Sequence, residues 1–189
     1  MALQGIRKTG QIQPGQKVLI NGAGGGVGTF AVQIAKLSET EVTGVDASHK
    51  LDAIGSLGAD HVIDYAQKDF TKTGERYDLV LDCQGYRSMF DYKRALRPGG
   101  IYAMVGGPLP RILQLLLLNF CGPLTGESRN LRLVAEGPNK GLADLRELID
   151  AGKLIPVVDR TFGLSQVPEA LAYFGQGHHK GKIVIDSDK

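Results

Sequence analysis

A cluster of glycines near the start of the chain separates a strand pattern from a helix pattern. The cluster, residues 21–28 (NGAGGGVG), follows the uninterrupted β-branched run 17–21 and precedes residues 29–37, whose apolar side chains recur at helical spacing. An uninterrupted apolar run is typical of a strand that is buried on both faces of a sheet. The cluster therefore predicts a strand–turn–helix unit.

The rest of the chain continues this alternation. Further strands are predicted at residues 41–45, 61–63, 77–81, 101–105 and 131–135, with a helix over 50–57 and a turn at 98–100 that stops a helix before the strand at 101. Strands that alternate with helices over short connections favour a parallel sheet covered on both faces. The sequence therefore predicts an α/β fold with a doubly wound parallel sheet.

The last part of the chain has a different pattern. An amphipathic helix is predicted at 142–149, followed by a strand near 157–158, a short helix at 167–174 and a last strand at 182–185. We expect a boundary near Ile155-Pro156, which gives a first domain of residues 1–155 and a second segment of residues 156–189.

Length and composition restrict the class of protein. A chain of 189 residues allows one domain or a domain with an appendage, and a hydrophobic content of 42% is enough for a packed core. With 22 basic and 20 acidic side chains the net charge is +2. This balance gives no electrostatic case for nucleic acid or an anionic membrane surface as a partner.

Cysteine usage and hydropathy favour a reducing compartment. Cys83 and Cys121 are far apart and form no CxxC pair, which argues against a disulfide framework and a structural zinc site. The N-terminus has no secretory signal pattern, and the apolar run Ile112–Phe120 is too short to span a bilayer. We therefore expect a cytoplasmic protein without membrane association.

The glycine cluster has the context of a phosphate-binding turn. Glycines permit a tight turn and let backbone N–H groups approach a pyrophosphate, while the helix N-terminus supplies partial positive charge. A strict GxGxxG is absent, because the register Ala23-x-Gly25-x-x-Gly28 begins with alanine. A purely structural tight turn is the alternative.

An acidic residue further along supports the phosphate-binding interpretation. Asp46 follows the strand at 41–45, about twenty residues after the glycines, where a carboxylate accepts hydrogen bonds from the hydroxyls of an adenosine ribose. The alternative is a helix N-cap, for which Asp46 or Ser48 is suitable. We place Asp46 and Ser48 among the candidate cofactor-binding residues.

Five stretches of sequence, spread over nearly the whole chain, share the pattern of a known family. They are residues 13–28 (QPGQKVLINGAGGGVG), 31–36 (AVQIAK), 56–65 (SLGADHVIDY), 97–100 (RPGG) and 177–185, which has the form GxxxGKIVI. Together they resemble the medium-chain dehydrogenase/reductase superfamily, in its zinc-independent, quinone oxidoreductase-like branch. The resemblance implies a Rossmann-type fold and an NAD(P)H-dependent oxidoreductase that acts on quinones or enones.

The resemblance also implies roles for matching positions. The turn residues Gly25, Gly26, Val27 and Gly28, with Gly24 beside them, would hold the pyrophosphate. Cys83 and Gln84 would lie beside the adenosine or its ribose, and Val105, Gly106 and Gly107 would face the nicotinamide. All these loops follow the C-terminal ends of predicted strands, where an open parallel sheet binds ligands.

The resemblance leaves the choice of dinucleotide open. Lys50 and Tyr65 match positions that contact the ribose 2′-phosphate in NADPH-using quinone reductases, whereas the carboxylate of Asp46 would repel a 2′-phosphate. We favour NADP(H) slightly over NAD(H). The alternatives are a solvated helix charge for Lys50 and an aromatic side chain that caps the core for Tyr65.

The resemblance implies that a substrate domain is missing. Family members begin with such a domain, and residues 1–5 match the helix that links it to the cofactor domain. Residues from about 157 onward would return to complete it, so we expect their apolar face to be exposed or covered by a partner chain. Alone, the chain is expected to bind its cofactor but not to turn over a small carbonyl or quinone substrate.

No catalytic residue or metal site can be assigned from the sequence. Asp82, Tyr92 and Asp159 are equally well interpreted as structural. The histidines and cysteines show no metal-ligand spacing, and the resemblance to the quinone reductase branch, which needs no metal, implies that none is bound. His178-His179 is interpreted as a solvated turn.

Assembly and two other functions are further hypotheses. The family resemblance implies a homodimer, with the strand at 131–134 as the candidate edge that pairs. A non-catalytic module that senses dinucleotide or binds another protein is the alternative function. A methyltransferase is disfavoured because the first strand ends in Asn21.

Overall fold

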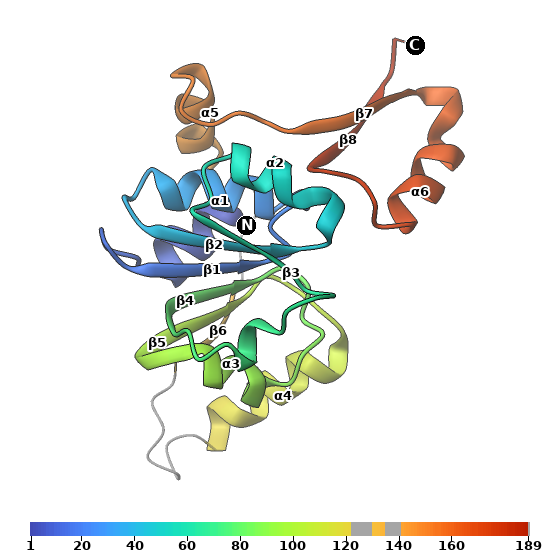
Figure 1. The fold of residues 1–189 in the computed structure, drawn as a ribbon. Coiled ribbons are helices and arrows are strands. Elements are labelled where there is room, and N and C mark those ends of the chain that lie inside the picture. The colour runs from blue at the N-terminus through green and yellow to red at the C-terminus, as the bar shows by residue number, and fades with distance from the viewer. Residues whose placement is uncertain (122–129, 135–140, 189) are drawn as a thin grey trace.

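Six parallel strands form the main sheet of the protein (Figure 1). The computed structural model describes residues 1–121, 130–134 and 141–188. The strand order is β3-β2-β1-β4-β5-β6. The strands are β1 (Lys17–Asn21), β2 (Glu41–Asp46), β3 (His61–Asp64), β4 (Tyr77–Asp82), β5 (Leu96–Met104) and β6 (Leu131–Leu133). The order reverses between β1 and β4, which confirms the predicted doubly wound α/β sheet.

Helices cover both faces of this sheet (Figure 1). They are η1 (Gln4–Thr9), α1 (Gly28–Lys36), η2 (Ser48–Lys50), α2 (Leu51–Ser56), η3 (Phe70–Lys72), α3 (Met89–Ala95), α4 (Leu109–Cys121) and α5 (Leu142–Asp150). Side chains from η1, α1, α2 and α5 pack on one face, and side chains from η3, α3 and α4 pack on the other. Successive side chains of β1 point to opposite faces of the sheet. Val18 and Ile20 pack in the core layer on the first face, and Leu19 packs in the layer on the second.

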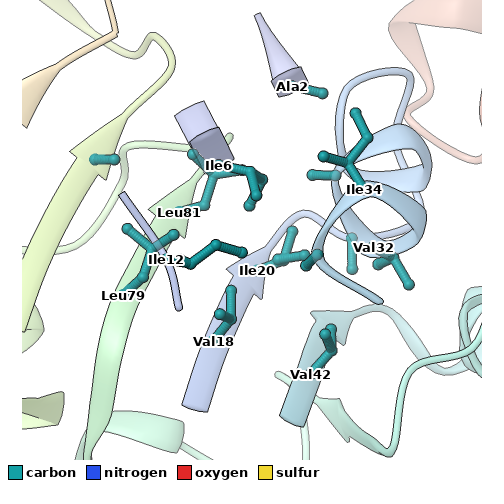
Figure 2. Close-up of a cluster of buried hydrophobic side chains, with 14 of the residues drawn as sticks. Ala2, Ile6, Ile12, Val18, Ile20, Val32, Ile34, Val42, Leu79 and Leu81 are labelled. Carbon is teal, nitrogen blue, oxygen red and sulfur yellow. The ribbon is translucent and has the colours of Figure 1, made fainter. Parts of the chain in front are cut away.

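The first core layer joins the N-terminal segment to the sheet. Figure 2 shows Ile6 and Ile12 among side chains of β1, β4 and α1, including Ile20, Leu81 and Ile34. Ile6, Ile20 and Ile34 are completely buried. Burying a large aliphatic side chain contributes about 1.5–3 kcal/mol each, so the segment that precedes β1 belongs to the folded unit.

Two details of the main sheet differ from the sequence predictions. Residues 98–100 were expected as a turn, but they form a bulge inside β5. Leu96 pairs with Tyr77 and Ile101 pairs with Leu79, so β5 has extra residues between these two pairs. Gly99 permits the bulge with a φ of 80°. Helix α4 was not predicted, because its exposed side includes Leu113, Leu116 and Leu117, so the run shows no polar face.

A second, two-stranded sheet follows the main one. β7 (Val158–Gly163) and β8 (Lys182–Asp186) pair in parallel, joined by η5 (Leu164–Gln166) and α6 (Val167–Gly175). In Figure 1 this unit extends beyond α2, away from the main sheet. Several of its large apolar side chains are exposed, among them Leu164, Leu171 and Phe174.

The remaining predicted elements are mostly confirmed. Strand β7 is longer than the strand expected near 157–158, while α5, α6 and β8 match their predictions within about one residue at each end. Ala135, the last residue of the strand predicted at 131–135, lies outside the described residues. Among the helices in the described parts of the chain, none is long and apolar enough to cross a membrane.

Candidate dinucleotide site

A cavity of about 770 Å³ lies at the C-terminal ends of the central strands. Its walls come from the ends of β1, β2, β3 and β4 and from residues 176–178, which precede β8. Four residues that were predicted for the site line the cavity: Asp46, Lys50, Tyr65 and Gln84. Gly22, a neighbour of the predicted turn residues, lines it as well. The cavity therefore opens where the strand order reverses, between β1 and β4.

The glycine turn is fixed between β1 and α1 by backbone contacts. Gly22, with a φ of 84°, and Ala23 both donate their N–H groups to Val45 O, at 2.9 and 3.1 Å. A Cβ on Gly28 would lie 2.1 Å from Gly22 O, which is far closer than real Cβ atoms approach. Close packing of α1 against the turn thus requires glycine at position 28.

Asp46 joins the end of β2 to the glycine turn. Its Oδ2 accepts the N–H of Gly24 at 2.8 Å, and its Oδ1 accepts the N–H of Ala47 at 2.8 Å. The side chain is buried. The N-cap position of η2 is held by Ala47, without a side-chain cap, so the alternative of an N-cap at Asp46 or Ser48 is wrong.

Lys50 is buried beside Asp46 and does not extend into solvent. Its Nζ donates to Gly177 O at 2.8 Å and lies 3.8 Å from Asp46 Oδ1. Its stem covers Gly24, where a Cβ would come within 2.9 Å of Lys50 Cβ. The interpretation of Lys50 as a solvated charge is therefore wrong. Tyr65 lines the cavity with 56% of its surface exposed, so it does not cap the core.

The segment before β8 lies across the glycine turn. Gly181 donates its N–H to Gly24 O at 2.8 Å. The Lys182 Nζ lies 3.0 Å from the position that a Cβ on Gly26 would take. Sequence reasoning did not select Lys182, although the GxxxGK pattern that contains it was recognised. This contact brings a second cation to the turn.

The solvated turn expected at His178-His179 fits His178, which is exposed, but not His179, which is half-buried. His49 Nε2 contacts His178 O at 3.3 Å, and both imidazoles line the cavity. The His179 ring stacks on Phe174, with centroids 4.8 Å apart. Burial, with Lys50 nearby, lowers the pKa of His179, which favours its neutral form.

A buried carboxylate organises the loop after β4. Asp82 is fully buried, and its Oδ1 accepts hydrogen bonds from Asn21 Nδ2 at 2.9 Å and from the N–H groups of Gln84 and Gly85 at 3.0 Å. Its Oδ2 accepts the hydroxyl of Tyr102 at 2.7 Å. These bonds fix the ends of three strands, so Asp82 has a structural role.

The tyrosines and the thiol near Asp82 are held in their protonated forms. Burial and the charge of Asp82 raise the pKa of Tyr92 and that of Tyr102. Burial, with Asp82 and Asp46 nearby, raises the pKa of the Cys83 thiol to about 12. A thiol in this state is a poor nucleophile.

The other predicted site residues lie outside the cavity wall. They are the turn residues Gly24, Gly25, Gly26, Val27 and Gly28, then Ser48 and Cys83, and finally Val105, Gly106 and Gly107. The β4 and β5 loops nevertheless touch, because a Cβ on Gly85 would lie 2.8 Å from Gly106 O. A search of residues 1–121, 130–134 and 141–188 finds no group of three metal-ligating side chains.

Comparison with known proteins identifies the relatives of this chain. Residues 57–185 match the family model described as zinc-binding dehydrogenase. The chloroplastic quinone-oxidoreductase QR1 of Triphysaria versicolor is 35% identical over 178 residues, which are 92% of this chain and 53% of the relative. The mitochondrial NAD(P)H oxidoreductase RTN4IP1 of Homo sapiens is 34% identical over 192 residues, with 91% and 48% covered.

A solved structure agrees with these sequence matches. The quinone oxidoreductase from Coxiella burnetii superposes with a TM-score of 0.81 at 25% identity, over 97% of this chain and 56% of that one. The chain thus spans about half the length of the proteins it matches. It belongs to the zinc-binding dehydrogenase family, within the quinone oxidoreductase-like branch of the medium-chain dehydrogenase/reductase superfamily.

Proposed function

We propose that this chain is the dinucleotide-binding half of an NAD(P)H-dependent oxidoreductase. The observation that carries the proposal is the 2.8 Å hydrogen bond from Gly24 N to Asp46, beside a cavity at the reversal of strand order. In open parallel sheets dinucleotides bind in this crevice. The cavity volume of about 770 Å³ lies within the range of roughly 300–1,000 Å³ that small-molecule sites occupy.

The glycine turn has the chemistry that a pyrophosphate needs. Helix α1 begins at Gly28, so the partial positive charge of its N-terminus is directed at the turn. The ammonium of Lys182 lies beside Gly26, 3.0 Å from the position that a Cβ there would take. We assign the pyrophosphate to Gly24, Gly25, Gly26, Val27, Gly28 and Lys182.

The remaining candidate residues would hold the nucleoside and nicotinamide parts. Each carboxylate oxygen of Asp46 accepts one backbone hydrogen bond and keeps a lone pair for a ribose hydroxyl. We assign Ser48, Tyr65, Cys83 and Gln84 to the surroundings of the adenosine, and Val105, Gly106 and Gly107 to the nicotinamide. When bound, the dinucleotide supplies the hydride.

The charges in the cavity wall favour NADP(H) over NAD(H). Asp46 is the one acidic residue in that wall, and backbone N–H groups and Lys50 partly offset its charge. The wall also contains Arg87 and the imidazoles of His49 and His178. A phosphate on the ribose would find more positive than negative groups here.

The whole protein would contain a substrate domain in addition to this chain. We assign residues 1–155 to the cofactor domain and residues 156–189 to the return segment of the substrate domain. The exposed Leu164, Leu171 and Phe174 support this assignment, as does a chain about half as long as its relatives. The complete protein would transfer hydride to a small carbonyl or quinone, because only a closed pocket excludes water from the nicotinamide.

Assembly and location stay predictions. In the described residues β6 is the last strand of the sheet, and Leu133 is 38% exposed, which leaves an edge for a second copy to pair with in a homodimer. The cytoplasmic location expected from the sequence is a separate prediction, since the two relatives named above are chloroplastic and mitochondrial proteins.

Thermal unfolding with and without dinucleotide tests the proposed function. A ligand that binds the folded state at 100 times its Kd adds about 2.7 kcal/mol of stability, so millimolar NADPH is expected to raise the Tm by several degrees. S-adenosylmethionine should have no effect. No shift with NADPH or NADH would contradict the proposal, and a shift with S-adenosylmethionine alone would favour a methyltransferase.

A matched pair of glycine variants locates the binding site. A Cβ on Gly25 meets only Gly22 O at 3.4 Å, which is ordinary contact, so Gly25→Ala should fold while its methyl group blocks a phosphate. Gly55 in α2 has nothing within 4 Å of its Cβ position, so Gly55→Ala is the control. The Tm shift should disappear in the first variant and persist in the second.

A further inference from the structure

Two histidines from distant parts of the sequence meet at the cavity. His49 belongs to η2, and His178 follows α6, 129 residues later. His49 Nε2 lies 3.3 Å from His178 O, and the two rings are edge to face with centroids 5.7 Å apart. Both side chains are exposed and line the cavity. The pair therefore closes the cavity wall where the C-terminal segment reaches the end of β2.

The other two cations of the cavity wall already have partners. Lys50 is buried, donates to Gly177 O and lies 3.8 Å from Asp46 Oδ1. The Arg87 guanidinium lies 3.0 Å from Asp69 and stacks over the ring of Phe70. Either cation would have to break an existing contact to reach an anion. The two imidazoles form no ion pair within the described parts of the chain, and the contact of His49 Nε2 with His178 O leaves Nδ1 of His49 for an anion.

Charged groups of both signs surround the pair. Asp46 shares the cavity wall, as do Lys50, Arg87 and the phenol of Tyr65. Next to His178, burial and the charge of Lys50 lower the pKa of His179, and Asp159, Asp46 and Lys182 also act on it. The wall thus holds one acidic group against two basic ones, and an added phosphate would favour protonated imidazoles.

We infer that His49 and His178 together bind the 2′-phosphate of NADP(H) and take up protons when they do so. This inference rests on the proposed dinucleotide site and names the residues that select between its two cofactors. Lys50, which the family resemblance favoured for this role, instead ties the C-terminal segment to the turn. The site is complete only when residues 176–178 lie against η2.

Proton uptake follows from the chemistry of the two partners. A free imidazole has a pKa of about 6.5, and the second pKa of a phosphate monoester is about 6. At pH 7.5 the phosphate is a dianion and most imidazoles are neutral, so contact raises the imidazole pKa and draws protons from solution. By linkage, affinity for NADPH then rises as the pH falls from 8.5 to 6.5. NADH carries no 2′-phosphate and lacks this dependence.

Titration calorimetry in buffers of different ionisation enthalpy measures the uptake directly. At pH 7.5 we expect a net uptake of protons with NADPH and none with NADH. We also expect NADPH affinity to tighten by about threefold to tenfold between pH 8.5 and 6.5, which corresponds to an average uptake of about 0.25 to 0.5 proton, since one full proton is worth about tenfold per pH unit. The variants His49→Gln and His178→Gln should each reduce the uptake and lower the ratio of NADPH to NADH affinity. His61→Gln is the control, because His61 lies on β3 beside Glu41 and outside the cavity wall.

The possible outcomes separate this inference from the proposed function. NADPH binding without proton uptake, or uptake that survives both histidine variants, would overturn the inference and leave the dinucleotide site intact. Absence of binding by both cofactors would instead contradict the proposed function. Equal loss of NADPH and NADH affinity in the variants would also overturn the inference. That result would mean that His49 and His178 contact the adenosine, which both cofactors share, and not the 2′-phosphate.

Discussion

The side-chain amide of Gln33 exchanges two hydrogen bonds with the backbone of Ile155. Nε2 donates to Ile155 O at 2.9 Å, and Oε1 accepts Ile155 N–H at 2.8 Å. Gln33 is buried in α1, and Ile155 lies between the main sheet and the β7–β8 sheet. This pair anchors the C-terminal unit to the helix that follows the glycine turn.

Gln33→Leu should loosen the C-terminal unit. The substitution removes the partner of the Ile155 N–H and C=O, at a cost of about 0.5–1.5 kcal/mol for each hydrogen bond. We expect faster proteolytic cleavage near residue 155 and a lower urea midpoint than in the wild-type chain. Gln67→Leu is the control, since Gln67 is exposed and its side chain has no role in either sheet. Unchanged cleavage in Gln33→Leu would show that other contacts hold the unit.

Gly28→Ala should destabilise the whole fold. The added Cβ would come within 2.1 Å of Gly22 O and 2.6 Å of Ala23 Cα, and both atoms belong to the backbone. Overpacking of this kind costs about 1–3 kcal/mol and occasionally more. Urea unfolding should show a clear fall in the free energy of unfolding, whereas Gly55→Ala should not be destabilised. A Gly28→Ala chain as stable as wild type would mean that the turn relaxes easily.

Tyr102→Phe should destabilise the chain by removing one donor to a buried carboxylate. The hydroxyl donates to Asp82 Oδ2 at 2.7 Å, and hydrogen bonds to charged groups contribute about 1.5–3 kcal/mol. Because Asp82 also holds the N–H groups of Gln84 and Gly85, NADPH affinity should fall with stability. Tyr86→Phe, which changes an exposed phenol, is the control for stability alone, because Tyr86 lines the cavity. A destabilisation below about 0.5 kcal/mol would contradict the role given to Tyr102.

Acid should remove the stabilisation that comes from Asp60. Partial burial alone would raise the pKa of its carboxyl, but hydrogen bonds from Lys36 Nζ and Val42 N–H outweigh this and lower it. A carboxyl with a lowered pKa in the folded state contributes stability above its unfolded pKa and loses it as the pH falls through the folded value. Urea unfolding between pH 7 and pH 3 should therefore show a smaller loss of stability in Asp60→Asn than in wild type. Equal losses would exclude this contribution.

The main sheet could be predicted because its signals are local. The apolar run at residues 17–21 and the glycines after it predict β1 and the turn, and Asp46 follows at the separation that a βαβ unit imposes. In the structure this spacing brings Asp46 to the glycine turn, where it accepts the hydrogen bond from Gly24 N–H. Periodicity and spacing therefore suffice to predict the fold and, within the candidate site, the glycine turn and Asp46.

The rest of the site depends on contacts that no local pattern contains. Lys50 is buried because Gly177 O lies above it, and His49 meets His178 because the C-terminal segment crosses the glycine turn. Lys182 reaches the turn for the same reason. Such long-range contacts are set by the packing of β7 and β8, so a reading of spacing near the glycines misses them.

An NMR titration of the isotope-labelled chain with NADPH tests the central claim most directly. If the dinucleotide binds as proposed, the backbone amides of residues 22–28, 46–50 and 84–87 should shift, while those at the opposite, N-terminal ends of β1 and β2 should not. Saturable shifts confined to these segments would support a dinucleotide site at the reversal of strand order. The absence of shifts, or shifts concentrated on α4 and β6, would contradict it.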